Sequence, residues 1–293
     1  MSDRSGSARR GIFVSPFDAL SDPSAMADLA VVAEAAGWDG VFVWDHVRYS
    51  APVAAIADPW ICLAAMAVRT ERLLLGPMVT PLPRRRPHVV ARQAASLERL
   101  APGRLVLGFG MGDDWLGEMS RFGDEADPVV RGAMLDEGLE VVTGLLSGHL
   151  VEHLGPHYRA EDVRFLPAPE RPIPIWIAGR FGKQAPLKRA ARFDGAFVIG
   201  YPGPEGVREV REAVASRRGD LDAFEVVVDV PAGTDPRPWA DAGATWVLSR
   251  FGPYELDAAA VLAAVEAGPE PVRRPGAPPS PDARAAARRG GRG

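Results

Sequence analysis

The sequence predicts an α/β fold, a (β/α)8 TIM barrel, from three observations. Short apolar runs alternate with longer helical patterns along most of the 293 residues. The runs lack the polar alternation of half-exposed strands, which is typical of parallel strands covered on both faces. There are eight such runs, and this number favours a closed barrel over a doubly wound sheet of about five or six strands.

Each predicted strand is followed by a predicted helix. The strands are expected at residues 11–14, 40–44, 73–79, 105–111, 173–178, 196–200, 224–230 and 245–249. The helices are expected near residues 23–36, 59–69, 87–100, 128–147, 183–192, 204–217, 235–242 and 256–267. Three helices begin at an Asp-Pro pair, at Asp22, Asp58 and Asp127, because Asp is a good N-cap and Pro suits the first helical position.

Three segments fall outside this repeat. Residues 148–171 are too long for an ordinary connection, so we expect an excursion near the mouth or side of the barrel. Residues 1–10 are small, polar and basic, and residues 268–293 are rich in Pro, Gly, Ala and Arg. We expect both ends to be disordered, which leaves one domain over residues 11–267.

The composition, 47% hydrophobic and 25% charged, is typical of a soluble globular protein. A net charge of −4 provides no electrostatic argument for a nucleic-acid partner. The absence of a long apolar run and of a secretory apolar segment predicts no membrane partner and a cytoplasmic location. The lone cysteine, Cys62, lies in an apolar stretch, and we interpret it as a small buried hydrophobe rather than a nucleophile.

Function in such a barrel lies where strands end and loops begin. His46 is the one histidine at a predicted strand end, where an imidazole can hydrogen-bond or move a proton near neutral pH. The competing interpretation is a structural histidine bonded to a neighbouring loop. Asp45 precedes it and would either orient His46 or cap the loop.

Glycines follow two other strands. Gly108, Gly110 and Gly112 alternate after the fourth strand, in a spacing that does not match a dinucleotide fingerprint. They would let the backbone approach a flat ligand or a neighbouring strand closely. Gly179 and Arg180 precede a helix start, which predicts a phosphate site built from backbone N–H groups and basic side chains, Lys183 among them. The alternative is an ordinary turn.

The remaining candidates carry weaker arguments. We interpret Arg84, Arg85 and Arg86 as the solvated start of a helix. His149 and His153 lack a third ligand, so no metal site is predicted. Several tryptophans near the mouth would wall an apolar slot or simply pack: Trp44, Trp60 and Trp115. No GxSxG or HExxH motif occurs, and the whole set suits a bound cofactor that performs the chemistry.

Four stretches carry a family resemblance: AEAAGWDGVFVWDH, LLLGPMVTPLPRRRP, ARQAASLERLAPGRLVLGFGMGD and PIPIWIAGRFGKQAPLKRAARFDGAFV. On these motifs the chain resembles the luciferase-like class of flavin-dependent oxidoreductases, which includes bacterial luciferase relatives and deazaflavin-dependent reductases. The resemblance covers about residues 11–200. The region after residue 200 is shorter than in many relatives.

The resemblance implies a TIM barrel with the cofactor ring across the strand ends. It places a non-proline cis peptide behind the ring near Pro77, Met78 and Val79, and His46 beside the ring. Gly179 and Arg180 would hold the cofactor phosphate. The fourth-strand glycines, Gly110 and Gly112 among them, would form the close-approach segment. We also count Asp45, next to His46, among the expected cofactor-binding residues.

Three functions stay open at this point. The preferred interpretation is a monooxygenase that uses reduced FMN and oxygen on a small organic substrate, with a flavin reductase as partner. The alternative is hydride transfer with the deazaflavin coenzyme F420. A third is a flavin-binding barrel without turnover, and a weaker fourth, a phosphosugar isomerase or aldolase, lacks a clear strand-end base. A homodimer also stays open.

Overall fold

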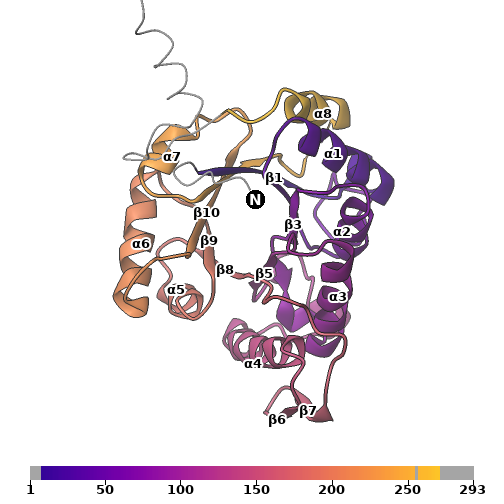
Figure 1. Ribbon diagram of the computed structural model, residues 1–293, viewed down its shortest axis with the longest axis vertical. Helices are drawn as coiled ribbons and strands as arrows, with labels where there is room; N and C mark the ends of the chain where they lie inside the picture. Colours follow the sequence, from indigo (N-terminus) through magenta and orange to yellow (C-terminus); the bar gives the residue numbers. More distant parts are fainter. Residues whose placement is uncertain (1–7, 255–256, 271–293) are drawn as a thin grey trace, which may run out of the picture.

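Parallel strands close into a barrel in the computed structural model, which describes residues 8–254 and 257–270 (Figure 1). In chain order the strands are β1 (Arg9–Val14), β2 (Gly40–Val43), β3 (Leu74–Pro77), β4 (Thr80–Pro81), β5 (Leu107–Gly110), β8 (Ile175–Arg180), β9 (Gly195–Ile199), β10 (Glu225–Pro231) and β11 (Trp246–Arg250). Their order in the sheet is β3-β2-β1-β11-β10-β9-β8-β5-β4. A parallel bridge joins Leu75 of β3 to Leu105, just before β5, and closes the sheet, so the predicted barrel is confirmed.

The predicted third strand is divided into β3 and β4 by a cis peptide bond between Met78 and Val79. This is the position that the family resemblance implied for a non-proline cis bond. The β4 half pairs with β5, through Thr80 and Phe109, and the β3 half pairs with β2. The division therefore produces nine strand labels from eight predicted strands.

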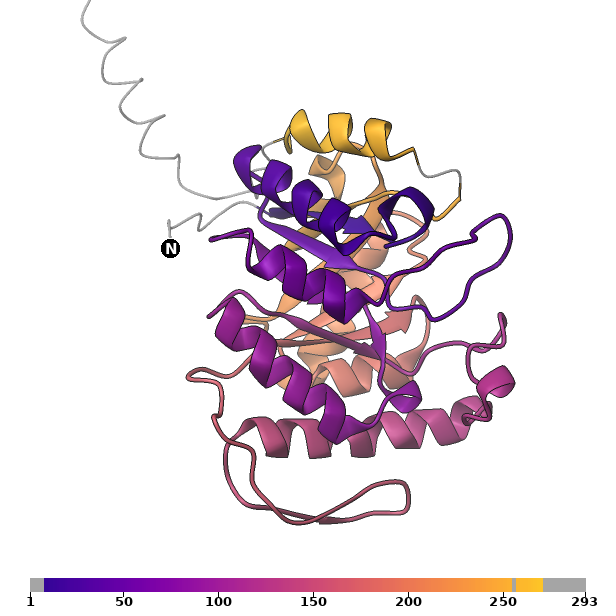
Figure 2. The same cartoon turned by 90° about the vertical axis from the view of Figure 1, so that its right-hand side faces the viewer.

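Helices surround the barrel (Figures 1 and 2). They are α1 (Pro23–Ala35), α2 (Pro59–Ala67), α3 (Pro87–Leu100), α4 (Pro128–Leu146), α5 (Gln184–Ala190), α6 (Glu205–Arg218), α7 (Arg237–Asp241) and α8 (Ala258–Glu266), with 3-10 turns at Asp18–Leu20, Leu82–Arg84 and Ser120–Phe122. The three Asp-Pro starts are confirmed, because the carboxylates of Asp22, Asp58 and Asp127 each accept from a backbone N–H of the first turn. Among the helices of the described ranges, none combines the length and the apolar character needed to cross a membrane.

Two apolar clusters organise the core. One lies between the strands and the surrounding helices, and the other fills the barrel interior. Phe42, Trp176 and Trp246 pack against one another in that interior, with ring centroids 5.3–5.6 Å apart. The barrel is therefore a packed core whose open surface for ligands lies at its end.

The excursion at residues 148–171 contains an antiparallel hairpin, β6 (Val151–Leu154) and β7 (Arg159–Val163). It lies outside the barrel beyond α4, so the side placement holds and the mouth placement does not (Figure 1). His153 Nε2 lies 3.0 Å from the Glu137 carboxylate of α4. This contact holds the hairpin against α4. In the described part of the chain, no cluster of three His, Cys, Asp or Glu residues is placed to hold a metal ion.

The structure describes only part of the two ends that we expected to be disordered. Residues 1–7 and 271–293 lie outside the described residues. Strand β1 begins at Arg9, two residues before the predicted domain boundary. The buried guanidinium of Arg10 donates to the Val247 carbonyl and to the Ser249 hydroxyl, because β1 pairs with β11 along its length.

Candidate active site

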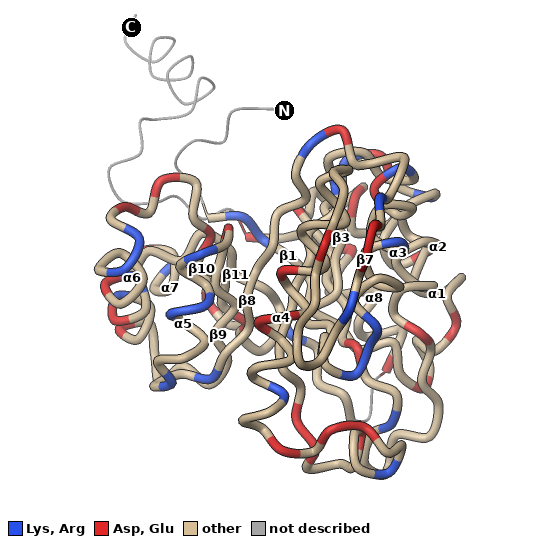
Figure 3. Tube along the Cα trace, turned by 90° about the horizontal axis from the view of Figure 1, so that it is seen from below, with Lys and Arg blue, Asp and Glu red and all other residues tan. Residues whose placement is uncertain are grey.

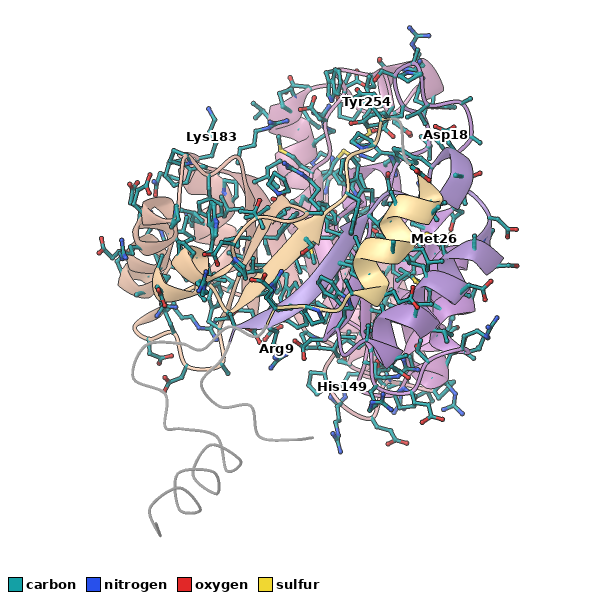
Figure 4. The ribbon with its side chains drawn as sticks, turned by 90° about the horizontal axis from the view of Figure 1, so that it is seen from above. Arg9, Asp18, Met26, His149, Lys183 and Tyr254 are labelled. Atoms are coloured by element: carbon teal, nitrogen blue, oxygen red, sulfur yellow. The ribbon has the colours of Figure 1, made fainter. Side chains whose placement is uncertain are left out.

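The mouth of the barrel is the end where the parallel strands terminate. Figure 4 shows Lys183, Tyr254 and Asp18 along this end, with Arg9 and His149 toward the opposite end. Interior-facing side chains change character along the strands, from fully buried rings to the half-buried Trp44, Val79, Ala178 and Ile199. These half-buried residues form the floor of the mouth.

Asp45 lies buried at the start of the loop that follows β2. Its carboxylate accepts from Thr80 Oγ1 at 2.8 Å and from the Arg85 guanidinium at 2.9 and 3.0 Å. Arg84 also donates to it. The Asp45 carboxylate is therefore saturated with donors from Thr80, Arg84 and Arg85, which leaves no free lone pair for a ligand. The orienting and cofactor-binding roles predicted for Asp45 stay predictions.

Glu118 is a site residue that the sequence analysis missed. It is 4% exposed and lies in the loop between β5 and α4. Its Oε2 lies 2.7 Å from His46 Nδ1, and its Oε1 accepts from Val47 N and from Arg84 at 2.9 Å each. No spacing rule marks a glutamate 72 residues after its partner, so only closure of the barrel reveals this pair.

Glu118 is ionised at neutral pH. Burial alone raises the pKa of its carboxyl group, but the hydrogen bond and charge of His46, the Val47 amide and the Arg84 guanidinium outweigh burial, and the net pKa is lowered. A carboxylate can only accept, so His46 Nδ1 donates. In the neutral ring the proton then sits on Nδ1, and Nε2 carries the lone pair.

Arg84 and Arg85 correct the prediction of a solvated helix start. Their side chains are 5% and 17% exposed and are paired with the buried carboxylates of Asp45 and Glu118. Charges so enclosed hold one another in place, and removing one leaves its partner buried and unpaired. The pair therefore acts as a rigid frame beneath His46.

Aromatic rings surround His46. Phe17, Trp44 and Tyr49 lie with ring centroids 5.1–6.0 Å from the imidazole. Tyr49 continues the wall to Trp115 and Tyr254, at 6.4 and 5.7 Å. Trp44 and Trp115 belong to this aromatic wall, whereas Trp60 is a buried packing residue whose Nε1 donates to Thr80. The slot itself stays a prediction.

The fourth-strand glycines serve close strand contact. A Cβ at Gly108 would lie 2.3 Å from the Pro77 carbonyl oxygen, and one at Gly110 would lie 2.9 Å from Val79 Cγ2. These glycines therefore allow β5 to pack directly on the Pro77–Val79 segment. Gly112, with φ +71°, makes room for Pro81 and for Met119, the neighbour of Glu118. The predicted close approach to a neighbouring strand is observed, and the cofactor role of Gly110 and Gly112 stays a prediction.

Two buried donors at the floor of the mouth have no hydrogen-bond partner among the described residues: Trp44 Nε1 and Ser15 Oγ. Trp44 packs on Phe13, a residue of the barrel interior, and Ser15 follows Phe13 at the spacing of side chains on one face of a strand. Buried polar groups are normally satisfied. A flat ring that carries acceptor atoms would satisfy both, so these residues fit a flavin-type cofactor.

The turn predicted to bind phosphate contains a glycine with a packing role. A Cβ at Gly179 would lie 2.3 Å from Pro186 Cβ, so this glycine is required for packing of α5 on β8. Arg180 is 65% exposed and pairs with Asp113 at 3.3 Å across the mouth. Gly182, with φ +78°, faces open space, and α5 begins without a side-chain cap. The amides of Phe181 and Lys183 already donate to the carbonyls of Ile199 and Arg180, and the cofactor role of Gly179 and Arg180 stays a prediction.

A second charged pair lies on β10 and β11. Asp229 is 3% exposed and accepts from Arg250 at 2.7 Å, while Arg250 is 40% exposed. Asp229 pairs with Leu248 in the sheet, and Leu248 belongs to the barrel interior. Burial raises the pKa of Asp229, and Arg250 offsets this only in part. The pair places a guanidinium at the strand ends that form the mouth.

Comparison with known proteins extends this description. A family model described as luciferase-like monooxygenase matches residues 8–273. The F420-dependent glucose-6-phosphate dehydrogenase of Nakamurella multipartita is 32% identical over 222 residues, which is 73% of this chain and 64% of that protein. The enzyme of the same name from Mycobacterium tuberculosis is 33% identical over 228 residues, 74% of this chain and 66% of that protein. The matched part of this chain thus spans about two thirds of these relatives' length.

A solved structure with the same fold is the coenzyme F420-dependent tetrahydromethanopterin reductase from Methanopyrus kandleri. It has a TM-score of 0.72 at 18% identity and covers 89% of this chain and 97% of its own. At this identity the likeness shows the fold alone.

Proposed function

Because this chain belongs to the luciferase-like monooxygenase family, with residues 8–273 matched, we propose that it is a coenzyme F420-dependent oxidoreductase acting on a hydroxyl or carbonyl carbon of a small organic molecule. The observation that carries this proposal is the His46–Glu118 pair, with Nδ1 and Oε2 2.7 Å apart at the mouth. The relatives named F420-dependent support the choice of cofactor. When bound, the deazaflavin would accept or supply a hydride.

The protein's own part in such a reaction is proton transfer and positioning. His46 Nε2 would take the proton of a substrate hydroxyl while the carbon loses its hydride to the cofactor, and the products are a carbonyl compound and the reduced cofactor. The ionised Glu118 would stabilise the imidazolium that results. In the reverse direction the imidazolium would return the proton to the oxygen.

Several mouth residues would position the cofactor and exclude water. Trp44 Nε1 and Ser15 Oγ offer unpaired donors, and the Pro77–Val79 segment would lie behind the ring. The aromatic wall of Tyr49, Trp115 and Tyr254 would shield the reacting atoms, which strengthens every charge interaction there. The turn from Gly179 to Lys183 would receive the phosphate.

The FMN monooxygenase interpretation, preferred from the sequence, now has less support than its alternative. A type II Baeyer–Villiger monooxygenase from Pseudomonas putida, solved with FMN, has a TM-score of 0.62 at 18% identity. This likeness supports the shared fold alone. The two relatives described above, 32% and 33% identical to this chain, are named for coenzyme F420. A flavin reductase partner would be needed only for the FMN reaction, and the homodimer stays a prediction.

Binding and turnover test the proposal. Purified protein is titrated with coenzyme F420 and with FMN, and we expect coenzyme F420 to bind at least about tenfold more tightly, a difference of about 1.4 kcal/mol. Anaerobic reduction of the cofactor is then followed with a panel of alcohols and sugar phosphates that includes glucose 6-phosphate. Turnover that requires oxygen and reduced FMN would refute the proposal, as would no difference between wild type and His46→Ala with the best substrate.

A further inference from the structure

A cavity lies on the outer side of the barrel, against the β6–β7 hairpin. Its volume is about 230 Å³, and it lies between the start of α3, the side of α4 and the turn of the β6–β7 hairpin. Figure 1 shows this hairpin outside the ring of helices, beyond α4. The cavity is small compared with pockets for drug-sized ligands, which are about 300–1,000 Å³.

The lining of this outer pocket is basic. Arg86, His88, His157 and Arg159 contribute to it, and no Asp or Glu is among the nine lining residues. The protein as a whole has a net charge of −4. Figure 3 shows Lys and Arg interspersed with Asp and Glu along the chain, so a lining that contains basic but no acidic residues differs from the mixed surface around it.

The guanidinium of Arg86 makes no ion pair with a described residue. No carboxylate partner for its guanidinium occurs among the residues that the structure describes, whereas Arg159 pairs with Glu161 at the edge of the pocket. The preceding arginines differ, because Arg84 and Arg85 are turned to the buried carboxylates of the active site. The arginine triplet is thus divided between two sites.

The hairpin turn that completes the pocket is held in place. Glu137 of α4 accepts from His153 Nε2, from His157 N at 3.1 Å and from Tyr158 N at 2.7 Å. These donors occupy the carboxylate of Glu137. Gly155 lies against the same carboxylate so closely that no Cβ fits. The basic residues of the turn are therefore preorganised, which lowers the entropy cost of binding a ligand.

Tyr158 adds a neutral donor beside the pocket. Burial raises the pKa of Tyr158 to about 12, with a further contribution from Glu137, so the hydroxyl keeps its proton at neutral pH. Its oxygen is covered and has no hydrogen-bond partner in the described part of the chain. Helix α3 also begins here without a side-chain cap, and the positive end of its dipole favours an anion.

We propose that this outer pocket binds a phosphate group, either as inorganic phosphate or as a small phosphomonoester. The planar fork of Arg86 suits two oxygens of one phosphate, and His88, His157 and Arg159 supply further donors. The site is separate from the phosphate position predicted at the barrel mouth.

Isothermal titration of the full chain with inorganic phosphate, at constant ionic strength, tests this site. Glycerol phosphate and succinate are the second and third ligands. The variants are Arg86→Glu and, as a matched control on the same helix, the exposed Arg99→Glu. Arg180→Ala reports on the mouth.

We expect phosphate or glycerol phosphate to bind with a Kd of about 1 mM or below, and the tighter of the two identifies the source of the phosphate group. Arg86→Glu should weaken binding at least tenfold, while Arg99→Glu and Arg180→Ala change it less than twofold. No binding below about 10 mM, equal binding of succinate, equal loss in Arg86→Glu and Arg99→Glu, or loss in Arg180→Ala alone each overturns the proposal. Thermal unfolding of each variant confirms that it is folded.

Discussion

Nδ1 of His46 lies 2.7 Å from Oε2 of Glu118, in a contact that joins two loops 72 residues apart. The carboxylate is covered and ionised, so it sets the imidazole tautomer and leaves Nε2 free to exchange a proton at the mouth. Arg84 and Asp45 hold this carboxylate and the His46 loop in one network. The catalytic predictions depend on this arrangement.

Glu118→Gln should reduce kcat by about 10²–10⁴-fold, the range for loss of a general acid–base function. The amide preserves the shape but loses the charge that stabilises the imidazolium. Asp124→Asn, in the same loop and exposed, removes one charge without touching His46 and should leave kcat unchanged. Steady-state kinetics with coenzyme F420 measure both, and equal kcat values in the two variants would contradict the role assigned to Glu118.

Trp44→Phe should weaken cofactor binding by about five- to tenfold, which corresponds to the loss of one neutral hydrogen bond. The indole N–H has no partner in the protein alone, so its removal breaks no existing bond. Trp246→Phe is the matched control, because its Nε1 is also unpaired but lies deep in the barrel. If both variants bind the cofactor like wild type, Trp44 does not contact it.

Arg250→Met should destabilise the protein by about 2 kcal/mol at pH 7, because Asp229 is then buried without its partner. The folded pKa of Asp229 is raised by burial, and it rises further without Arg250. A raised acid favours the folded state below its unfolded pKa and loses that contribution as pH rises through the folded pKa. Urea unfolding should therefore show a smaller defect at pH 5 than at pH 7.

The control for this prediction is Arg180→Met. Arg180 and its partner Asp113 are both more than half exposed, so the change should cost at most about 0.5 kcal/mol at either pH. A defect in Arg250→Met that does not depend on pH would show that Asp229 stays ionised.

Gly108→Ala should destabilise the protein by about 1–3 kcal/mol or more, because the new methyl group meets the Pro77 carbonyl at 2.3 Å. Gly132→Ala is the opposite case. Gly132 lies within α4 with nothing within 4 Å of the added Cβ, and alanine there should stabilise by about 0.5–1 kcal/mol. Chemical denaturation measures the free energy of unfolding of both variants. It tests whether the contacts of the added methyl group decide if alanine stabilises or destabilises the protein.

Cys62 should not react with iodoacetamide at pH 8 in the folded protein. The side chain is fully buried, and burial raises the pKa of its thiol to about 12, so no reactive thiolate is available. One equivalent of label should appear after unfolding in urea. Labelling of the native protein, measured by mass spectrometry, would contradict the buried position.

Much of the fold was readable from local patterns. Runs of apolar residues marked the strands, and Asp-Pro pairs marked the starts of α1, α2 and α4, because capping and periodicity involve residues close in sequence. His46 and the Met78–Val79 cis bond were also located, the second only through family resemblance. The split of the third strand and the hairpin within residues 148–171 were not predicted.

The site depended on contacts that no local pattern contains. Arg84, Arg85 and Arg86 look alike in sequence, yet two are enclosed with carboxylates and the third lines an outer pocket. Their directions follow from the short turn at Leu82–Arg84 and from its packing on α4. Burial of a charge depends on what lies opposite it, and that is decided by the tertiary structure.

The sequence by itself therefore determined a barrel of eight strands with a histidine at one strand end, since strand count and order are local and cumulative properties. Only the tertiary structure decided that Glu118 completes the site with His46 and that Asp45 is occupied by two arginines. The physical reason is closure of the sheet. Closure brings loops of different strands to one end, and there the partners of a buried charge come from distant positions in the chain.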